Sequence, residues 1–253
     1  MQNTALAFVL LVLSACSSTG GVQTWGSMRE VLKEGATEGR VALAEDGAFV
    51  GSGGSEWVGV GALEGLAGEV TIGGQRVWVS AVEDGKLSVR PAEPGDRAAL
   101  LIAAEVDGWT VFSLGSQADL LALEAALGAL LEDEGYRLDT PVPVRLTGRA
   151  AALDLHVIDG ACPIANPDGP PPFRGSYSGR VTLVGVYAEG RAGELTHHGR
   201  RTHLHAVVEG EGGTPVAAGH LDDLQLEEVS VFLPERPRRS SGVSFGVGFG
   251  AVL

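Results

Sequence analysis

Short apolar runs of strand length, separated by glycine-rich turns, follow one another along most of this chain of 253 residues. Residues 70–72 and 76–82 flank a Gly73-Gly74 turn and predict a β-hairpin. Further strands are predicted at residues 98–103, 109–114, 142–146, 153–158, 180–187 and 202–208, and from 220 or 224 to 233. The 38 glycines fit the many tight turns that such a series requires. This pattern restricts the chain to a fold rich in β-structure.

Only two segments predict helices. The longer one is capped at residues 116–119, carries a leucine stripe on one face between residues 120 and 131, and ends before Gly135. The shorter one begins at Ser27, with Glu30 completing a capping box, and ends at Gly35. Strands in series with two helices predict an α+β fold, built on a mixed or antiparallel sheet that extends across two lobes.

A segment rich in proline and glycine at residues 161–172 predicts the division between the two lobes, near residue 165. We therefore expect an N-terminal α+β lobe at residues 25–165. Residues 166–253 are expected to form a C-terminal lobe that is mostly β and carries the candidate metal site.

The charge balance excludes some partners. The chain has 18 Lys and Arg against 32 Asp and Glu, a formal net charge of −14, and it contains no cluster of basic residues. Because phosphate contacts need clustered positive charge, we expect no nucleic-acid partner. A hydrophobic fraction of 44% with 20% charged residues also excludes intrinsic disorder.

The amino terminus predicts export. Residues 5–15 are an apolar run, too short to span a bilayer core of about 30 Å but of the length of a signal-peptide core. The run ends in Leu13-Ser14-Ala15-Cys16, which resembles the lipobox of bacterial lipoproteins. Residues 1–16 are therefore predicted to be a lipoprotein-type signal peptide ending at a lipidated Cys16, and residues 17–24 a flexible tether.

This interpretation places the protein on the periplasmic or cell-surface side of a bacterial membrane, in contact with that membrane only through a lipid anchor. Residues 1–4 lack Lys and Arg, which is a departure from the usual signal peptide. The alternatives are an ordinary secretory signal cleaved nearby, or an apolar start without a targeting role.

Five of the six histidines lie between residues 197 and 220. His203 and His205 alternate with Leu204 in a predicted strand, so both imidazoles point to one face. The glycine-rich segment 209–218 can turn the chain so that His220 arrives on the neighbouring antiparallel strand. Three neutral nitrogen donors on one side of a divalent ion leave positions open for water or substrate, as in catalytic metal sites.

The alternative is a group of surface histidines without a function. His197 and His198 lie in a polar turn and are expected to be exposed, and His156, in an alternating strand, is expected to be a core histidine with a partner.

The segment 179–233, with His203-Leu204-His205 followed by Gly219-His220, resembles the α-acetolactate decarboxylases. The resemblance extends to residues 22–28, 61–69 and 143–148. It implies that His203, His205 and His220 bind Zn²⁺, that Glu69 is a carboxylate near the metal, and that Arg145 is a cation near the substrate.

The chain also departs from that family. Ala62 and Glu64 stand where the family has threonine and asparagine, and no acidic residue follows Glu235, although the family has another glutamate near the metal there.

The resemblance implies a zinc-dependent carboxy-lyase that converts 2-acetolactate, a small 2-hydroxy-3-keto acid, to acetoin and CO₂. Arg145 would orient the carboxylate that leaves, and Glu69 would relay a proton. The sequence leaves open whether the protein forms a homodimer.

The departures motivate an alternative, a catalytically weakened surface lipoprotein of the same fold that binds a metal or a small molecule. A metal-dependent hydrolase with Glu69 as its general base is a further alternative.

Overall fold

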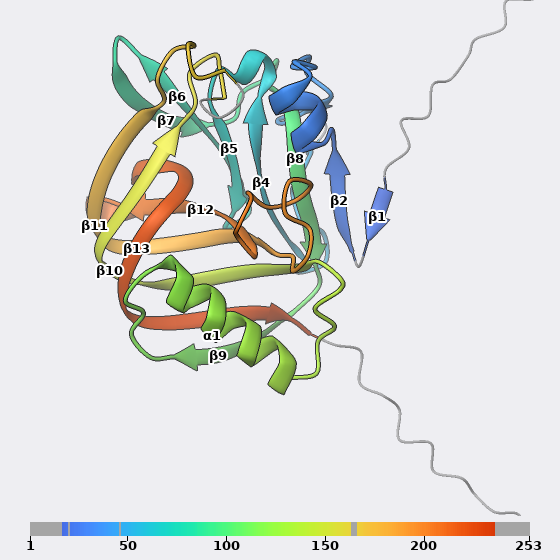
Figure 1. Ribbon diagram of the computed structural model, residues 1–253, viewed down its shortest axis with the longest axis vertical. Coiled ribbons are helices and arrows are strands. Elements are labelled where there is room, and N and C mark those ends of the chain that lie inside the picture. Colours follow the sequence, from blue (N-terminus) through green and yellow to red (C-terminus); the bar gives the residue numbers. More distant parts are fainter. Residues whose placement is uncertain (1–16, 20, 46, 163–165, 236–253) are drawn as a thin grey trace, which may run out of the picture.

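A computed structural model describes residues 17–19, 21–45, 47–162 and 166–235, which form two antiparallel sheets with few helices (Figure 1). This architecture confirms the predicted α+β class. The eight-stranded first sheet contains β1 (Ser17–Thr19), β2 (Val22–Trp25), β8 (Arg97–Val106), β4 (Glu56–Leu63), β5 (Glu69–Gly73), β6 (Arg76–Glu83) and β7 (Lys86–Pro91) in that spatial order, and β3 (Val41–Ala42) pairs with β8. The five-stranded second sheet contains β9 (Trp109–Leu114), β10 (Val142–Val157), β11 (Phe173–Tyr187), β12 (Thr202–Glu209) and β13 (Pro215–Pro234).

The predicted helices form at the expected places. The helix α1 (Leu120–Asp133) begins after Asp119, whose side chain accepts a hydrogen bond from the backbone N–H of Ala122. The shorter segment is one π-helical turn (Arg29–Lys33), and the Ser27 hydroxyl accepts the backbone N–H of Glu30 there. Two short 3₁₀ turns (Glu64–Leu66 and Glu211–Gly213) complete the helical elements of the described residues.

The division of the chain differs from the one predicted near residue 165. The chain passes from the first sheet to the second between β8 and β9, at residues 107–108. β10 pairs with β11 across the segment rich in proline and glycine, so that segment connects two neighbouring strands of one sheet. The lobe boundary is wrong because turn composition alone does not distinguish a connection within a sheet from a boundary between sheets.

The predicted tether at residues 17–24 is also corrected. Ser17–Thr19 pairs with β2, and β2 in turn pairs with the central strand β8. Val22 is buried there against Ile102 and Ala104. Burial of an apolar side chain and a ladder of backbone hydrogen bonds hold this segment in the sheet.

Four strands of the second sheet, β10 to β13, pair in a closed ring. β12 lies between β11 and β13, and β10 pairs with both β11 and β13. Irregular register between Ala150 and Leu153, and again along the β10–β13 ladder, lets these long strands bend. The core enclosed by these strands also receives the leucines of α1 at positions 120, 123, 127 and 131.

The two sheets pack against each other through apolar side chains. Val58 of β4 and Val106 of β8 contact Val184 of β11. A second cluster joins Val60 and Ile102 to Val186. In the described residues, no helix is long and apolar enough to span a membrane.

Candidate metal centre

The strand register brings the histidines of the second sheet into one row. His205 of β12 lies opposite His220 of β13, and His220 lies opposite His156 of β10. The ring of His203, two residues before His205, has its centroid 5.1 Å from that of His220 and 5.5 Å from that of His205. The rings of His203, His205 and His220 are therefore neighbours, but the ligand atoms that lie within 4.8 Å of one another belong to His197, His203 and His220.

Close approach of two strands is needed to form this row. Gly185 of β11 lies opposite Leu204 and has a φ of +151°. A Cβ atom added there would lie 1.9 Å from the carbonyl oxygen of His203. Only glycine allows this spacing, so the residue helps to fix the backbone position of His203.

His197 belongs to the cluster as well, which corrects the expectation that it would be exposed. It lies in the connection between β11 and β12 and is half-buried, whereas its neighbour His198 is exposed as expected. Ligand atoms of His197, His203 and His220 all lie within 4.8 Å of one another. The signal that could have identified His197 was its position a few residues before the strand that carries His203.

The cluster is electrically neutral. Burial, reinforced by the neighbouring imidazoles, lowers the pKa of His203 to about 3 and holds the pKa values of His205 and His220 well below their ordinary range. Burial also lowers the pKa of His197. Neutral imidazoles are the form that binds metal ions.

The hydrogen bonds of the rings also suit a metal. Nδ1 of His203 donates to the carbonyl oxygen of Leu195 at 3.0 Å, which leaves the lone pair on Nε2. Nδ1 of His205 lies 3.0 Å from the Thr71 hydroxyl of the first sheet. Among the described residues, Nε2 of His205 finds no hydrogen-bond partner although it is buried. A buried nitrogen without a partner is costly, and a bound ion would satisfy it.

Glu69 begins β5 and reaches the cluster from the first sheet. Its side chain is buried, and Oε2 lies 3.7 Å from Nε2 of His205. Burial raises the pKa of Glu69 well above its ordinary value, Asp222 adds to this effect, and the backbone N–H of Ile158 opposes it. The surroundings of Glu69 therefore favour the protonated form of its carboxyl group.

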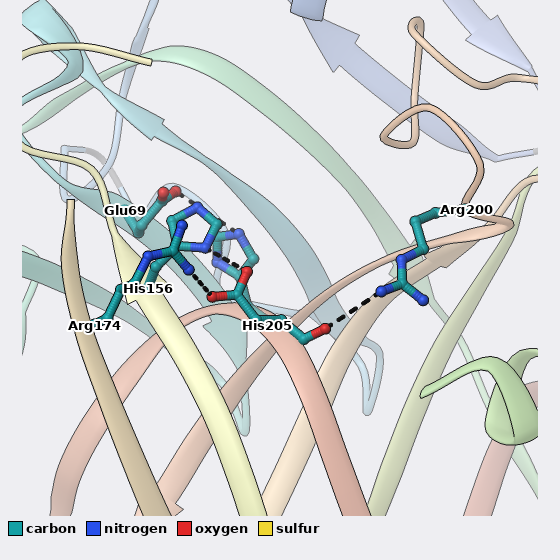
Figure 2. A network of polar contacts seen from close by, with 6 residues as sticks. Glu69, His156, Arg174, Arg200 and His205 are labelled. Carbon is teal, nitrogen blue, oxygen red and sulfur yellow. Dashed lines mark hydrogen bonds and ion pairs between the residues drawn. The ribbon is translucent and has the colours of Figure 1, made fainter. Parts of the chain in front are cut away.

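A second polar group, which includes His156, Arg174 and Arg200, lies next to the histidine cluster (Figure 2). Oδ1 of Asp222 lies 2.7 Å from Nδ1 of His156, and Oδ2 accepts a hydrogen bond of 2.6 Å from Arg174. Arg200 donates to the backbone carbonyl of Asp222 at 3.4 Å. Burial acts to raise the pKa of Asp222, but the hydrogen bond and charge of His156 and the charge of Arg174 bring it below its ordinary value.

His156 thus has a partner, Asp222, as expected, and it also lines a cavity beside the cluster. No local pattern predicts Asp222, Arg174 and Arg200 as site residues, because strand register and the path of the connection 188–201 bring them to the histidines.

These side chains line a cavity of about 240 Å³. Its polar wall contains His197, His203, His220, Glu69 and Asp222, and its apolar wall includes Met28, Ala62, Leu100 and Ile158. A mixed wall of this kind suits a small polar molecule with an apolar part.

Arg145, which the resemblance implies to lie near the substrate, lies outside this cavity. It does not line the cavity and sits near the end of β10 opposite to His156. Its guanidinium donates to Glu56 of β4 at 2.7 Å and covers the ring of Phe232, with its central carbon 4.1 Å from the ring centroid. The pair instead joins the two sheets.

Two features of the sequence lie outside the described residues. Cys16 and the predicted signal peptide precede residue 17, and the tail without acidic residues follows Glu235.

No protein-family profile matches the chain, and no curated protein matches it by sequence. Solved structures do share its fold. The α-acetolactate decarboxylase of Bacillus subtilis strain 168 superposes with a TM-score of 0.65 at 18% sequence identity over 85% of each chain. The acetolactate decarboxylase of Bacillus subtilis subspecies spizizenii gives 0.63 at 17% identity, also over 85% of each chain.

A Staphylococcus aureus protein of unknown function, described as similar to α-acetolactate decarboxylase, gives a TM-score of 0.59 at 16% identity over 78% of each chain. The chain therefore has the fold of the acetolactate decarboxylases.

Proposed function

We propose that this protein is a metal-dependent decarboxylase that converts 2-acetolactate to acetoin and CO₂. The observation that carries the proposal is one cavity lined both by neutral histidines whose ligand atoms converge and by the buried carboxyl group of Glu69. The fold shared with acetolactate decarboxylases supports the choice of substrate.

The donor set suits a transition metal, and we propose Zn²⁺. His203, His205 and His220 would hold the ion, as the sequence resemblance implies. Such an ion, when bound, supplies Lewis acidity toward the ketone and hydroxyl oxygens of an α-hydroxy ketone. Imidazole donors favour Zn²⁺ over Mg²⁺ or Ca²⁺, which prefer oxygen ligands.

The remaining groups of the cavity divide the other tasks. Loss of CO₂ breaks the bond between the carboxylate and the carbon that bears the hydroxyl group, and leaves an enediolate. Glu69, buried and able to hold its proton, would deliver that proton to the carbon and give acetoin. Arg200 and Arg174, which line the cavity, would replace Arg145 as the cations that meet the substrate carboxylate.

The position of Arg145 favours one alternative, a binding module of the same fold with little catalytic activity. Arg145 is held by Glu56, and the arginines that line the cavity both contact Asp222. A site whose cations are already paired would bind a carboxylate more weakly.

One assay separates the two proposals. The purified full chain is loaded with Zn²⁺, its metal content is measured, and it is incubated with racemic acetolactate. We expect acetoin to form well above the spontaneous rate, from one enantiomer first. Stoichiometric zinc with acetoin only at the spontaneous rate would contradict the enzyme and support the binding module.

A further inference from the structure

His197 differs from the other histidines of the cluster in the element that carries it. His203, His205 and His220 belong to β12 and β13, whereas His197 belongs to the connection 188–201 between β11 and β12. Its ring centroid lies 4.6 Å from that of His220 and 5.6 Å from that of His203. Its ligand atom lies within 4.8 Å of those of His203 and His220, a group to which His205 does not belong.

The connection holds His197 in this place by its own hydrogen bonds. The backbone N–H of Leu195 donates to the carbonyl of Arg191, and the Leu195 carbonyl accepts Nδ1 of His203. The buried Thr196 donates its hydroxyl to the carbonyl of Arg200 at 2.9 Å. His197 thus stands between two anchored points and faces the histidines of the sheet.

We propose that His197 is an additional metal ligand, supplied by the connection 188–201, that joins the histidines of β12 and β13 around one ion. The inference rests on the proposed metal site and extends it. Three of the nearby imidazoles come from the paired strands β12 and β13, and a fourth comes from a connection outside the named strands.

Two consequences follow from this geometry. The imidazole of His197 would take a coordination position that would otherwise stay open, so fewer positions would remain for substrate oxygens. The metal also links the connection to the sheet, so metal release and loosening of residues 188–201 become coupled events.

The first test uses Co²⁺, whose visible spectrum reports the number and geometry of its ligands. The full-length protein and its His197→Ala and His197→Gln variants are loaded with Co²⁺, and metal affinity is measured by competition with a chelator. We expect both variants to change the spectrum and to lose at least about tenfold in affinity, since removal of an outer-shell partner alone costs 10- to 100-fold.

His198→Ala is the matched control, because His198 is the adjacent residue of the same connection and is exposed. It should leave spectrum and affinity unchanged. An unchanged spectrum with an affinity within twofold of wild type in the His197 variants would overturn the inference.

A second test does not use the metal spectrum and measures proteolysis instead. Arg200 and Arg201 are trypsin sites in the same connection. If His197 binds the ion, metal should slow cleavage there in the wild-type protein and have much less effect in His197→Gln. Equal protection by metal in both proteins would contradict a role for His197, and much weaker protection in a His197→Gln protein with the circular dichroism spectrum of wild type would support it.

The outcomes also distinguish this inference from the proposed function. Wild-type protein that binds metal and forms acetoin, together with His197 variants of unchanged affinity, would overturn only the role of His197. Wild-type protein that binds no metal would overturn both. A wild-type protein that binds metal through His197 but forms no acetoin would overturn only the decarboxylase.

Discussion

Glu69 is the side chain on which the proposed chemistry depends. It is 5% exposed, and no Lys or Arg forms an ion pair with it among the described residues. Burial raises its pKa in the metal-free protein. The same carboxyl group in water would have given up its proton at neutral pH and could not deliver one.

Glu69→Gln keeps the shape of the side chain and removes the proton donor. We expect acetoin formation to fall by about 10²- to 10⁴-fold, the usual contribution of general acid catalysis. Metal content should stay near the wild-type value, because the imidazole ligands are unchanged. Turnover and zinc content of the same samples check this prediction.

Glu64→Gln is the matched control for this variant. Glu64 precedes Glu69 by five residues and is exposed, so its activity should equal that of wild type. Full activity in Glu69→Gln would exclude Glu69 as the proton donor.

We predict that Arg145 stabilises the folded protein. Its side chain is 20% exposed, and its partner Glu56 also accepts hydrogen bonds from the backbone of Gly74 and the indole of Trp109. Arg145→Ala should lower the free energy of unfolding by about 2 kcal/mol, below the 3–5 kcal/mol of a fully buried pair. Turnover of the folded variant should change little.

Urea denaturation measures this change, and Arg149→Ala serves as the control. Arg149 lies on the same strand, 3.8 Å from Glu227, and its side chain is 66% exposed. An exposed pair contributes at most about 1 kcal/mol. A large loss of turnover in Arg145→Ala at unchanged stability would return Arg145 to the active site.

The helix α1 is tied to the strand that carries two of the histidines. Glu124 of α1 is buried, and one of its carboxylate oxygens accepts the backbone N–H groups of Arg201 and Thr202 and the Thr202 hydroxyl. These bonds fix the start of β12 directly before His203. The leucine stripe predicts a buried helix, but only the packed structure shows that its one buried acid positions the metal centre.

The turn between β7 and β8 predicts a dependence of stability on pH. Arg90 donates two hydrogen bonds to Asp96, at 2.6 and 2.9 Å, and the backbone N–H of Glu93 donates a third. Arg90 in particular lowers the pKa of Asp96 below its ordinary value. The stabilisation is therefore present above the unfolded-state pKa of about 3.9 and is lost as the pH falls through the lower folded-state value.

Asp96→Asn should thus lower the free energy of unfolding by up to about 1 kcal/mol at pH 7, since the pair is partly exposed. The difference from wild type should become progressively smaller below about pH 4. Urea unfolding of both proteins at pH 7 and at the lowest pH where the wild type stays folded checks this. A difference that grows on acidification would contradict the assignment.

At the scale of the whole molecule, the candidate site exists only where the two sheets meet. Thr71 and Glu69 come from β5 of the first sheet, and His203, His205 and His220 come from the second. The figure of the whole chain shows β5 and β12 side by side although far apart in sequence (Figure 1). Loss of either sheet would therefore remove part of the site.

The proposed lipid anchor also belongs to this scale. We propose that Cys16, which precedes the described residues, attaches the protein to a membrane. Cys16→Ser should move the protein from the membrane fraction to the soluble fraction, because the acyl chains provide the membrane affinity. Fractionation with immunoblotting checks this, and membrane association of Cys16→Ser would contradict the anchor. The control is Cys162→Ser, at a buried free cysteine.

The sequence alone determined the elements and part of the site. Alternation at His203 and His205, the hairpin at residues 70–82 and the leucine stripe of α1 are local patterns, and all three are present in the structure. Local patterns are reliable here because side-chain direction repeats every two residues in a strand and about every 3.6 in a helix.

Tertiary structure decided what local pattern cannot encode. In the structure, residues 17–24 belong to a sheet, and the chain passes from one sheet to the other at residues 107–108. His197 and Asp222 line the cavity, and Arg145 forms an ion pair with Glu56. Each of these outcomes depends on the pairing of strands distant in sequence or on the path of a connection. Register and packing between distant segments are set by burial and hydrogen bonding of the whole fold, so they appear only when the sheets come together.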